Sequence, residues 1–396
     1  MSVREPLPPD SAELAERAGS WRSAYVHIPF CRRRCPYCDF AVVAFDEISG
    51  DRERSIESYV SAVVDEISLE SEWSELDAVN LGGGTPSTLS QRQLFQIIDA
   101  LGRRFGIATD AEVSLEANPE DVTLPKAQEW AAAGINRVSL GAQSFDRSIL
   151  GVLGRRHDPE QSPQAVAHLR TAGIRSISVD LLFGSAGENM GSWLETVKGA
   201  IDLETDHLSA YGLTVEPGTD LWRQVRGGAE APDPDHQADE YLALQKALTR
   251  TELMQYEVSN WARPGHVCRY NLATWAQGEY IAFGLGAHGH RDGARRRNVR
   301  RLDTYLARIT AGQRPEAGRD RQSALSADLE RVMLGLRRSS GVIAGAVGEM
   351  LVESADGRRM RSAGILGLND GRLVVLKPLL TDTVIRSVLS LSPGDC

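Results

Sequence analysis

The sequence predicts an α/β fold in which six βα units form a curled, partial barrel, followed by a small C-terminal α+β domain. Three observations lead to this expectation. Short β-branched or apolar runs alternate with longer helical patterns over the first two thirds of the 396 residues, which is typical of parallel strands joined by helices. The strand-like runs alternate between polar and apolar residues. The last part of the chain ends in a helix–helix–hairpin pattern.

The six expected strands are short runs rich in β-branched or apolar residues. They cover residues 24–28, 78–81, 112–116, 137–141, 177–182 and 208–213. The expected helices between and after them cover residues 56–70, 91–105, 125–133, 164–172, 193–203 and 235–250. Gly106, Gly134 and Gly173 follow three of these helices, as expected for left-handed helix C-termini.

The alternation within the strands favours a barrel over a flat sheet. Parallel strands that are buried on both faces usually read as continuous apolar runs, but here Tyr25 and His27 share one face of the first strand. One face of the sheet can therefore take the helices, and the other must line something hydrophilic. Polar residues also finish three strands, where barrel sites are built; they are Glu116, Gln143 and Asp180.

The rest of the chain is expected to form three further parts. Residues 1–20 are a polar N-terminal extension, residues 21–290 hold the barrel with a glycine-rich C-terminal extension, and residues 291–320 are a basic and polar connection. A helix then begins near Ala324, and an Asp370-Gly371 turn precedes a short strand. This order predicts a winged-helix-like domain over residues 321–396.

Composition excludes several classes of protein. A net charge of −10 repels polyanions, so we expect no nucleic-acid partner. We find no apolar stretch long enough to span a membrane and no export or organelle signal in residues 1–20, so we expect a cytoplasmic protein. Three of the five cysteines fall within eight residues, which points to metal or redox chemistry rather than disulfides.

The clustered cysteines are Cys31, Cys35 and Cys38, directly after the first expected strand. Three thiolates on one loop can bind three irons of a 4Fe–4S cluster and leave the fourth iron open for an amine and a carboxylate. The alternative is a structural zinc ion with His27 as the fourth ligand. Structural zinc normally uses paired knuckles, and a second pair is missing, so the spacing predicts the cluster.

Six motifs then carry a resemblance to a known family. They are residues 25–31 (YVHIPFC), 35–40 (CPYCDF), 82–86 (GGGTP), 115–119 (LEANP), 140–145 (LGAQSF) and 180–184 (DLLFG). In this order they resemble the radical S-adenosylmethionine (SAM) family that contains oxygen-independent coproporphyrinogen III oxidase and the heme chaperone HemW. The resemblance covers most of the chain and implies a radical SAM barrel.

The resemblance also implies which residues bind SAM. Its amine should meet Gly83, Gly84 and Thr85, its sulfonium should lie near Tyr25, and its adenine should meet the backbone of Tyr37. Its amino-acid and ribose groups should contact Glu116, Gln143, Arg155 and Asp180. A glycine run lets the backbone approach a ligand, and the arginine fork suits a carboxylate. The alternative roles for the two acidic residues are a helix cap or a structural ion pair.

Two other patterns carry less weight. Residues 284–289 match GxGxxG, but polar, arginine-rich sequence follows instead of a helix, so no dinucleotide site is expected. A basic cluster follows, formed by Arg291, Arg295, Arg296, Arg297, Arg300 and Arg301. Such a cluster is either a solvated loop or a site for anionic groups such as the propionates of a tetrapyrrole.

Two features favour a HemW-like heme chaperone that binds a 4Fe–4S cluster, SAM and heme and delivers heme to acceptor proteins. The oxidase carries a fourth cysteine where this chain has Phe40, and it has a longer N-terminal segment. The alternative is a coproporphyrinogen III oxidase that forms protoporphyrinogen IX by oxidative decarboxylation, or a related radical enzyme with a porphyrinogen substrate. A degenerate structural protein is a third hypothesis. The resemblance also implies an electron donor and allows a homodimer.

One departure from the family leaves the heme ligand open. The family pattern His-Asn-x-x-Tyr-Trp, linked to heme handling, begins here with Tyr270 and carries Thr274 in place of the tyrosine. Histidine, thiolate and phenolate all bind heme iron. The candidate ligands are therefore Tyr270, Cys268, His266, His288 and His290, although Cys268 can equally be an inert buried thiol.

Overall fold

A computed structural model describes residues 16–391 of the chain. The predicted N-terminal extension lies mostly outside these residues. At the centre is a twelve-stranded sheet in the order β14-β13-β12-β11-β1-β4-β5-β6-β7-β8-β10-β9. Its six middle strands are parallel: β1 (Ser23–Ile28), β4 (Leu76–Gly83), β5 (Ile107–Ala117), β6 (Arg137–Gln143), β7 (Ser176–Phe183) and β8 (His207–Gly212). This confirms the predicted α/β barrel.

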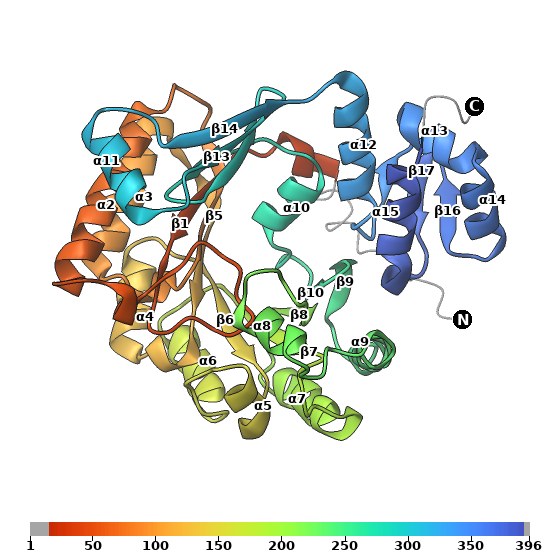
Figure 1. The fold of residues 1–396 in the computed structure, drawn as a ribbon, viewed down its shortest axis with the longest axis horizontal. Helices are drawn as coiled ribbons and strands as arrows, with labels where there is room; N and C mark the ends of the chain where they lie inside the picture. Colours follow the sequence, from red (N-terminus) through yellow and green to blue (C-terminus); the bar gives the residue numbers. More distant parts are fainter. Residues whose placement is uncertain (1–15, 392–396) are drawn as a thin grey trace.

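Helices cover the outside of the curved sheet (Figure 1). They are α2 (Arg52–Leu69), α3 (Gln91–Phe105), α4 (Leu124–Ala132), α6 (Gln161–Thr171), α7 (Met190–Asp202) and α9 (Pro234–Leu248). The outward side chains of the strands, such as Val26, Val138 and Val179, are fully buried in one apolar core with these helices. The inward side chains are polar, as the alternation predicts.

Shorter elements connect these units. They are η1 (Ala18–Ser20), β2 (Phe30–Cys31), β3 (Val43–Ala44), η2 (Phe45–Glu47), η3 (Pro86–Thr88), η4 (Pro119–Asp121), α5 (Arg147–Val152) and α8 (Asp220–Arg226). Strands β2 and β3 pair in parallel and hold the two ends of the cysteine loop together. Within residues 16–391, no helix is both long enough and apolar enough to cross a membrane.

Residues 291–320 are not a connection, so this prediction is wrong. Strand β11 (Tyr280–Phe283) pairs in parallel with β1 and starts an extension of the main sheet. The extension continues with β12 (His288–Arg291), β13 (Ala294–Asn298), α11 (Leu302–Thr310) and β14 (Glu316–Arg321), and its strands are antiparallel. Strands β13 and β14 were not predicted from the sequence because arginines occupy positions that strands usually fill with apolar residues.

Helix α10 (Arg269–Trp275) lies across the amino ends of the parallel strands. The backbone N–H of Arg269 donates to Glu112 Oε1 on β5 at 2.9 Å. The ring of the following residue, Tyr270, stacks on the ring of Tyr25 with centroids 6.0 Å apart. Helix α10 therefore forms a floor beneath the polar lumen. On the far edge of the sheet, β10 (Asn260–Ala262) and β9 (Met254–Glu257) follow β8.

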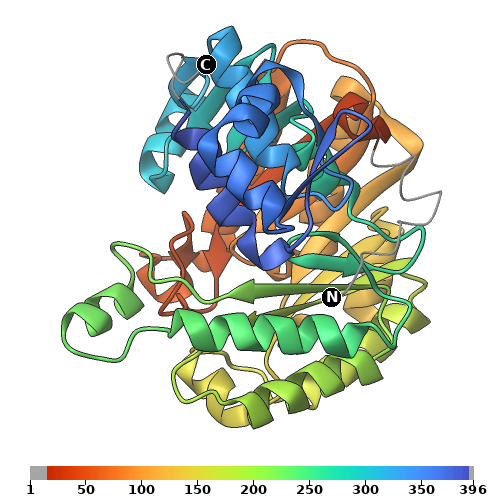
Figure 2. The ribbon, with the colours of Figure 1, turned by 90° about the vertical axis from the view of Figure 1, so that its right-hand side faces the viewer.

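The C-terminal residues build a second unit with an apolar core of its own. Its elements are α12 (Ala324–Gly335), β15 (Val342–Ile343), α13 (Gly345–Glu353), α14 (Ala355–Ser362), β16 (Leu366–Asn369), β17 (Arg372–Val375), η5 (Pro378–Leu380) and α15 (Thr381–Leu389). Leu351, Leu373 and Val384 lie in its core, and its three strands have the order β15-β17-β16. The unit packs beside the barrel (Figure 2), where the Ser339 N–H donates to Tyr256 O at 2.9 Å.

Candidate metal and cofactor site

The cysteine loop leaves strand β2 at the carboxyl end of the barrel. Cys31, Cys35 and Cys38 are half-buried and carry free thiols. Thr85 Oγ1 donates to Cys31 Sγ at 3.4 Å. Burial, followed by the proximity of Cys38 and Cys35, raises the pKa of Cys31 to about 11. A metal that binds these thiols must therefore displace their protons.

His27 is not available as a fourth ligand for zinc. Its Nε2 lies 2.9 Å from Ala41 O, and its Nδ1 lies 3.0 Å from the Tyr25 hydroxyl, so both ring nitrogens already have partners. In the described part of the chain, no three His, Cys, Asp or Glu side chains could hold a single metal ion. A 4Fe–4S cube binds each thiolate through a different iron, so its ligands need not converge on one point. The donor set fits a cluster.

The glycine run ends strand β4 directly beside the cysteine loop. A side chain cannot be accommodated there: a Cβ on Gly84 would lie 2.6 Å from Pro29 O, and Gly83 has a φ of +111°. The Gly83 N–H donates to Glu116 Oε2 at 3.1 Å. The end of strand β4 therefore exposes backbone without side chains beside the carboxylate of Glu116. A polar ligand can approach this backbone closely.

Two carboxylates face the lumen from neighbouring parts of the sheet, Glu116 on β5 and Asp180 on β7. Burial, with a smaller contribution from Asp180, raises the pKa of Glu116 to about 7. Burial also raises the pKa of Asp180, although the hydroxyls of Ser139 and Ser178 donate to it at 2.8 and 3.2 Å. Within residues 16–391 neither carboxylate caps a helix or forms a salt bridge, so both remain available to a cationic ligand.

Arg155 lies between these carboxylates and the cysteine loop. Its Nη2 donates to Asn118 Oδ1 at 2.5 Å and to Gly141 O at 2.9 Å, while its Nη1 lies 3.9 Å from Cys35 Sγ. Burial opposes its charge, but Tyr37, Cys35 and Glu120 outweigh this effect and raise its pKa. The guanidinium is therefore fixed and charged next to the cysteine loop.

Gln143 ends strand β6 in a strained conformation. Its φ is +65°, and the pairing of β6 with β7 shifts register just before it. A left-handed backbone is unusual for a residue other than glycine, and such strain gathers at functional sites. The shift turns the end of β6 toward Arg155, since a Cβ on Gly141 would lie 2.8 Å from Gln143 Nε2 and 3.2 Å from Arg155 Nη2.

The two tyrosines of the predicted site come from different segments, Tyr25 from β1 and Tyr37 from the cysteine loop. Tyr25 stands in the lumen, where burial and the charge of Glu116 raise the pKa of its phenol. Tyr37 packs against an apolar group that includes Leu153 and Leu182, and burial raises its pKa. Both phenols are neutral at pH 7 and offer aromatic faces rather than charge.

Several residues of the site have contacts that the sequence motifs do not predict. Asn118 lies within a quoted motif and holds Arg155. Ser139 and Ser178 alternate with the apolar residues of β6 and β7, and this alternation is the available signal for their contacts with Asp180. His27, the alternative zinc ligand, instead orients Tyr25 through its Nδ1, which lies 3.0 Å from the Tyr25 hydroxyl.

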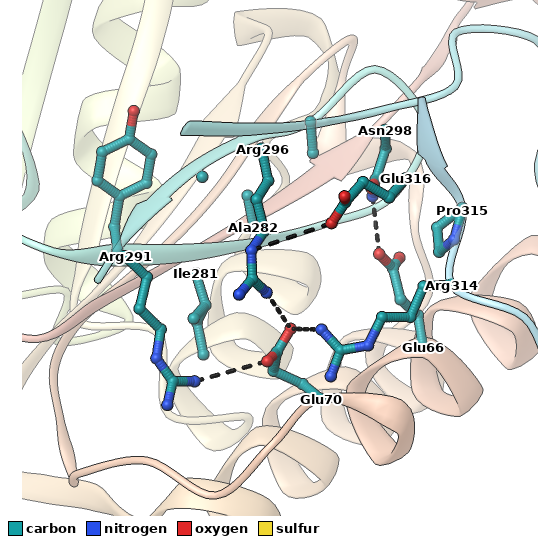
Figure 3. A pocket seen from close by; sticks show the side chains of 13 residues that line it. Glu66, Glu70, Ile281, Ala282, Arg291, Arg296, Asn298, Arg314, Pro315 and Glu316 are labelled. Carbon is teal, nitrogen blue, oxygen red and sulfur yellow. Dashed lines mark hydrogen bonds and ion pairs between the residues drawn. The ribbon is translucent and has the colours of Figure 1, made fainter. Parts of the chain in front are cut away.

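Four arginines of the basic cluster, Arg291, Arg295, Arg296 and Arg301, pair with carboxylates of the protein, and the first three of them are partly buried, so a solvated loop does not describe that part of the cluster. Arg291, Arg296 and Arg314 converge on the carboxylate of Glu70, the residue that follows helix α2, at 3.5, 3.6 and 2.9 Å (Figure 3). Arg295 pairs with Glu330 at 2.7 Å. These contacts attach the extension to the rest of the molecule.

The glycine-rich pattern at residues 284–289 leads into strand β12, not into a helix. The helix that follows a dinucleotide-binding turn is thus replaced here by a strand. The Gly284 N–H donates instead to the buried Glu66 Oε2 at 2.8 Å. The glycines allow the chain to pass close to helix α2.

Comparison with known proteins decides the family. A sequence model of the radical SAM superfamily matches residues 25–200. A protein named heme chaperone HemW from Mycobacterium tuberculosis (strain ATCC 25618 / H37Rv) is 36% identical over 384 residues, which cover 95% of this chain and 97% of the relative. The chain belongs to the HemW family. As a radical SAM protein it uses a 4Fe–4S cluster and SAM.

Further members of the HemW family show the same relationship. HemW of Synechocystis sp. (strain ATCC 27184 / PCC 6803 / Kazusa) is 37% identical over 327 residues, 81% of this chain and 79% of the relative. HemW of Escherichia coli (strain K12) is 36% identical over 271 residues, 67% and 69% of the two chains. The solved structure of coproporphyrinogen III oxidase (HemN) from Escherichia coli has a TM-score of 0.78 and 20% identity, and the match covers 98% of this chain and 94% of that one. That structure shares the fold.

Proposed function

We propose that this chain is a heme chaperone that binds a 4Fe–4S cluster and SAM, takes up heme and delivers it to acceptor proteins. The relationship to HemW carries the proposal, because 36% identity extends over 97% of the mycobacterial relative. The cysteine loop adds support: where the resembling oxidase has a fourth cysteine, this chain has Phe40, whose side chain is 59% exposed. An aromatic ring in that position cannot bind iron.

We further propose that Cys31, Cys35 and Cys38 bind the cluster. When bound, it supplies an electron and an open iron that chelates the methionyl group of SAM. The residues proposed to hold SAM are Tyr25, Tyr37, Gly83, Gly84, Thr85, Glu116, Gln143, Arg155 and Asp180. The bare backbone at Gly83, the two unpaired carboxylates and the fixed guanidinium support this assignment, because SAM offers a cationic amine, a carboxylate and ribose hydroxyls to match them.

The first experiment separates the chaperone from the oxidase. The cluster is reconstituted anaerobically, and SAM, a reductant and coproporphyrinogen III are added while protoporphyrin fluorescence is followed. We expect no turnover by a sample whose cluster absorption is intact. The same sample should then bind heme in a titration and pass it to a heme-free acceptor protein. Turnover of coproporphyrinogen III would contradict the chaperone and support the oxidase.

The partners and location of the protein are proposals of their own. We infer an electron donor from the radical SAM chemistry, and a homodimer and a cytoplasmic location from the sequence. Light scattering of the reconstituted protein tests the homodimer, and a monomeric mass over the micromolar range would contradict it. Cell fractionation tests the location.

A further inference from the structure

The polar face of the barrel does not stop at β1 but continues over the extension. In the sheet, Tyr25 pairs with Ala282 on β11, Tyr280 pairs with His290 on β12, and His288 pairs with Arg297 on β13. Paired residues point to the same face of a sheet. His288 and Arg297 therefore stand side by side on the face that also carries Tyr25, at its outer rim.

His288 is an exposed imidazole surrounded by cations. Burial, and then the charges of Arg297, Arg300 and Arg295, lower its pKa, while its one contact with a carbonyl is to the backbone of Gly286. The ring is thus neutral at pH 7, and one nitrogen keeps a free lone pair. A neutral imidazole with a free nitrogen is the form that binds iron.

Arg297 and Arg300 are exposed and differ from the other arginines of the basic cluster. Arg291, Arg296 and Arg301 each have a carboxylate within 3.6 Å. No such partner is found for Arg297 or Arg300 in the described part of the chain, and Arg300 Nη2 donates only to the backbone carbonyl of Asp39, at 2.7 Å. Two guanidinium groups at this rim can therefore still accept anions.

The rim also touches the cysteine loop. A Cβ on Gly286 would lie 2.7 Å from Ala41 Cβ, and the Asp39 carbonyl that receives Arg300 precedes Phe40, which is 59% exposed. An imidazole, two uncommitted guanidinium groups and an exposed aromatic residue are therefore close together. These groups match a flat apolar ring that carries an iron and two carboxylates.

We propose that this rim is the heme-docking site, with His288 as an axial ligand of the iron and Arg297 and Arg300 as partners of the two propionates. The inference rests on the proposed function, in which heme is the cargo. It names the residues that hold the cargo and places it next to the cysteine loop.

The other ligand candidates are less suited to bind iron from the surface. Cys268 is buried, donates to Glu112 at 3.5 Å, and burial raises its pKa to about 12. His290 is buried, with Nδ1 3.2 Å from Gly278 O. His266 lies 3.3 Å from Ser176 on the floor side of the barrel. Burial raises the pKa of Tyr270, which disfavours the phenolate that iron would need.

The test compares heme with metal-free protoporphyrin IX in titrations of the full-length, cluster-loaded protein. We expect His288→Ala to change the Soret band of bound heme, to regain the wild-type spectrum with added imidazole, and to leave protoporphyrin affinity unchanged. The double variant Arg297→Ala/Arg300→Ala should weaken both ligands about tenfold or more, because charge-assisted bonds to the propionates are lost. His266→Ala and Arg301→Ala are the matched controls, and neither should have an effect.

The outcomes separate this inference from the proposed function. If the wild type binds heme and neither rim variant differs from it, the docking site is wrong and the chaperone stands. A changed Soret band in Tyr270→Phe instead of His288→Ala would overturn the ligand assignment. A wild type that binds no heme would overturn the proposed function together with this inference. Unchanged cluster absorption and circular dichroism verify that each variant is folded.

Discussion

Glu116 is poised between its two protonation states, because burial raises the pKa of its carboxyl to about 7. The deprotonated form attracts a cation and the protonated form does not. SAM affinity should therefore increase as the pH rises from about 6 to 7.5, within the window of this titration. Calorimetric titration at several pH values measures the change, and Glu116→Gln should remove most of it. A wild type with pH-independent affinity would contradict this role.

The cysteine assignment makes a simple prediction. Cys35→Ala should lose the visible absorption of the 4Fe–4S cluster after anaerobic reconstitution, because one iron then lacks its thiolate. Cys268→Ala is the matched control: its buried thiol donates to Glu112, so the cluster should be retained. Iron and sulfide analysis provides the measurement. A full complement of both in Cys35→Ala would refute the assignment.

Asp180 should act on SAM and not on the cluster. Its carboxylate lies on β7, away from the cysteine loop, and is held by hydroxyl groups. Asp180→Ala should weaken SAM binding roughly tenfold, the loss of one hydrogen bond to a charged group, while the cluster absorption stays unchanged. Asp202→Ala, at an exposed position on α7, is the control. Unchanged affinity in Asp180→Ala would count against its role.

At the scale of the elements, helix α2 holds the extension through one buried carboxylate. Glu66 accepts hydrogen bonds from the Gly284 N–H at 2.8 Å, Tyr305 at 2.6 Å and Asn298 at 2.7 Å. Glu66→Ala leaves these donors buried without a partner, so we expect about 2–4 kcal/mol lower free energy of unfolding. Urea denaturation measures it. The exposed neighbour variant Asp65→Ala should stay within about 0.5 kcal/mol of the wild type, and equal losses in both would contradict this prediction.

The elements also show what the sequence could predict and what it could not. The six βα units were predictable because each strand alternates between a helix-facing and a lumen-facing side. Strand β13 (Ala294–Asn298) was not, because Arg296 gains its partners from distant parts of the chain, Glu70 at the end of helix α2 and Glu316 on β14. Periodicity within one strand cannot reveal a charge that lies more than two hundred residues away in the sequence. The winged-helix-like character of the C-terminal unit and the domain bounds other than those of the connection at residues 291–320 stay predictions.

The candidate site also contains residues that the sequence could predict and residues that it could not. The cysteines, the glycine run and the strand-end carboxylates were predictable because motif spacing and side-chain alternation place them at one end of the barrel. The proposed heme ligand could not be predicted from the sequence. His288 differs from His290 only in exposure and neighbours, which depend on the pairing of β12 with β13 and on the approach of the cysteine loop.

For the whole molecule, ligand binding should appear as heat stability. SAM at a hundred times its Kd should stabilise the folded state by about 2.7 kcal/mol, since the unfolded chain has no lumen to bind it. Differential scanning calorimetry of the cluster-loaded protein should show a melting temperature that rises with SAM concentration. Asp180→Ala should need a higher concentration for the same rise, and an unchanged melting temperature in the wild type would argue against a site in the barrel.

Helix α10 lies at the amino ends of the strands, whereas the cysteine loop and the rim with His288 lie at the carboxyl ends. Glu116 and Asp180 lie inside the lumen, whereas His288 stands at its rim. With heme docked at the rim as proposed, it would lie over the carboxyl ends of the strands, so we expect SAM to bind before heme and to leave after it. A heme in place would slow the escape of SAM without touching it, and the chaperone would keep its cofactor for as long as it carries its cargo.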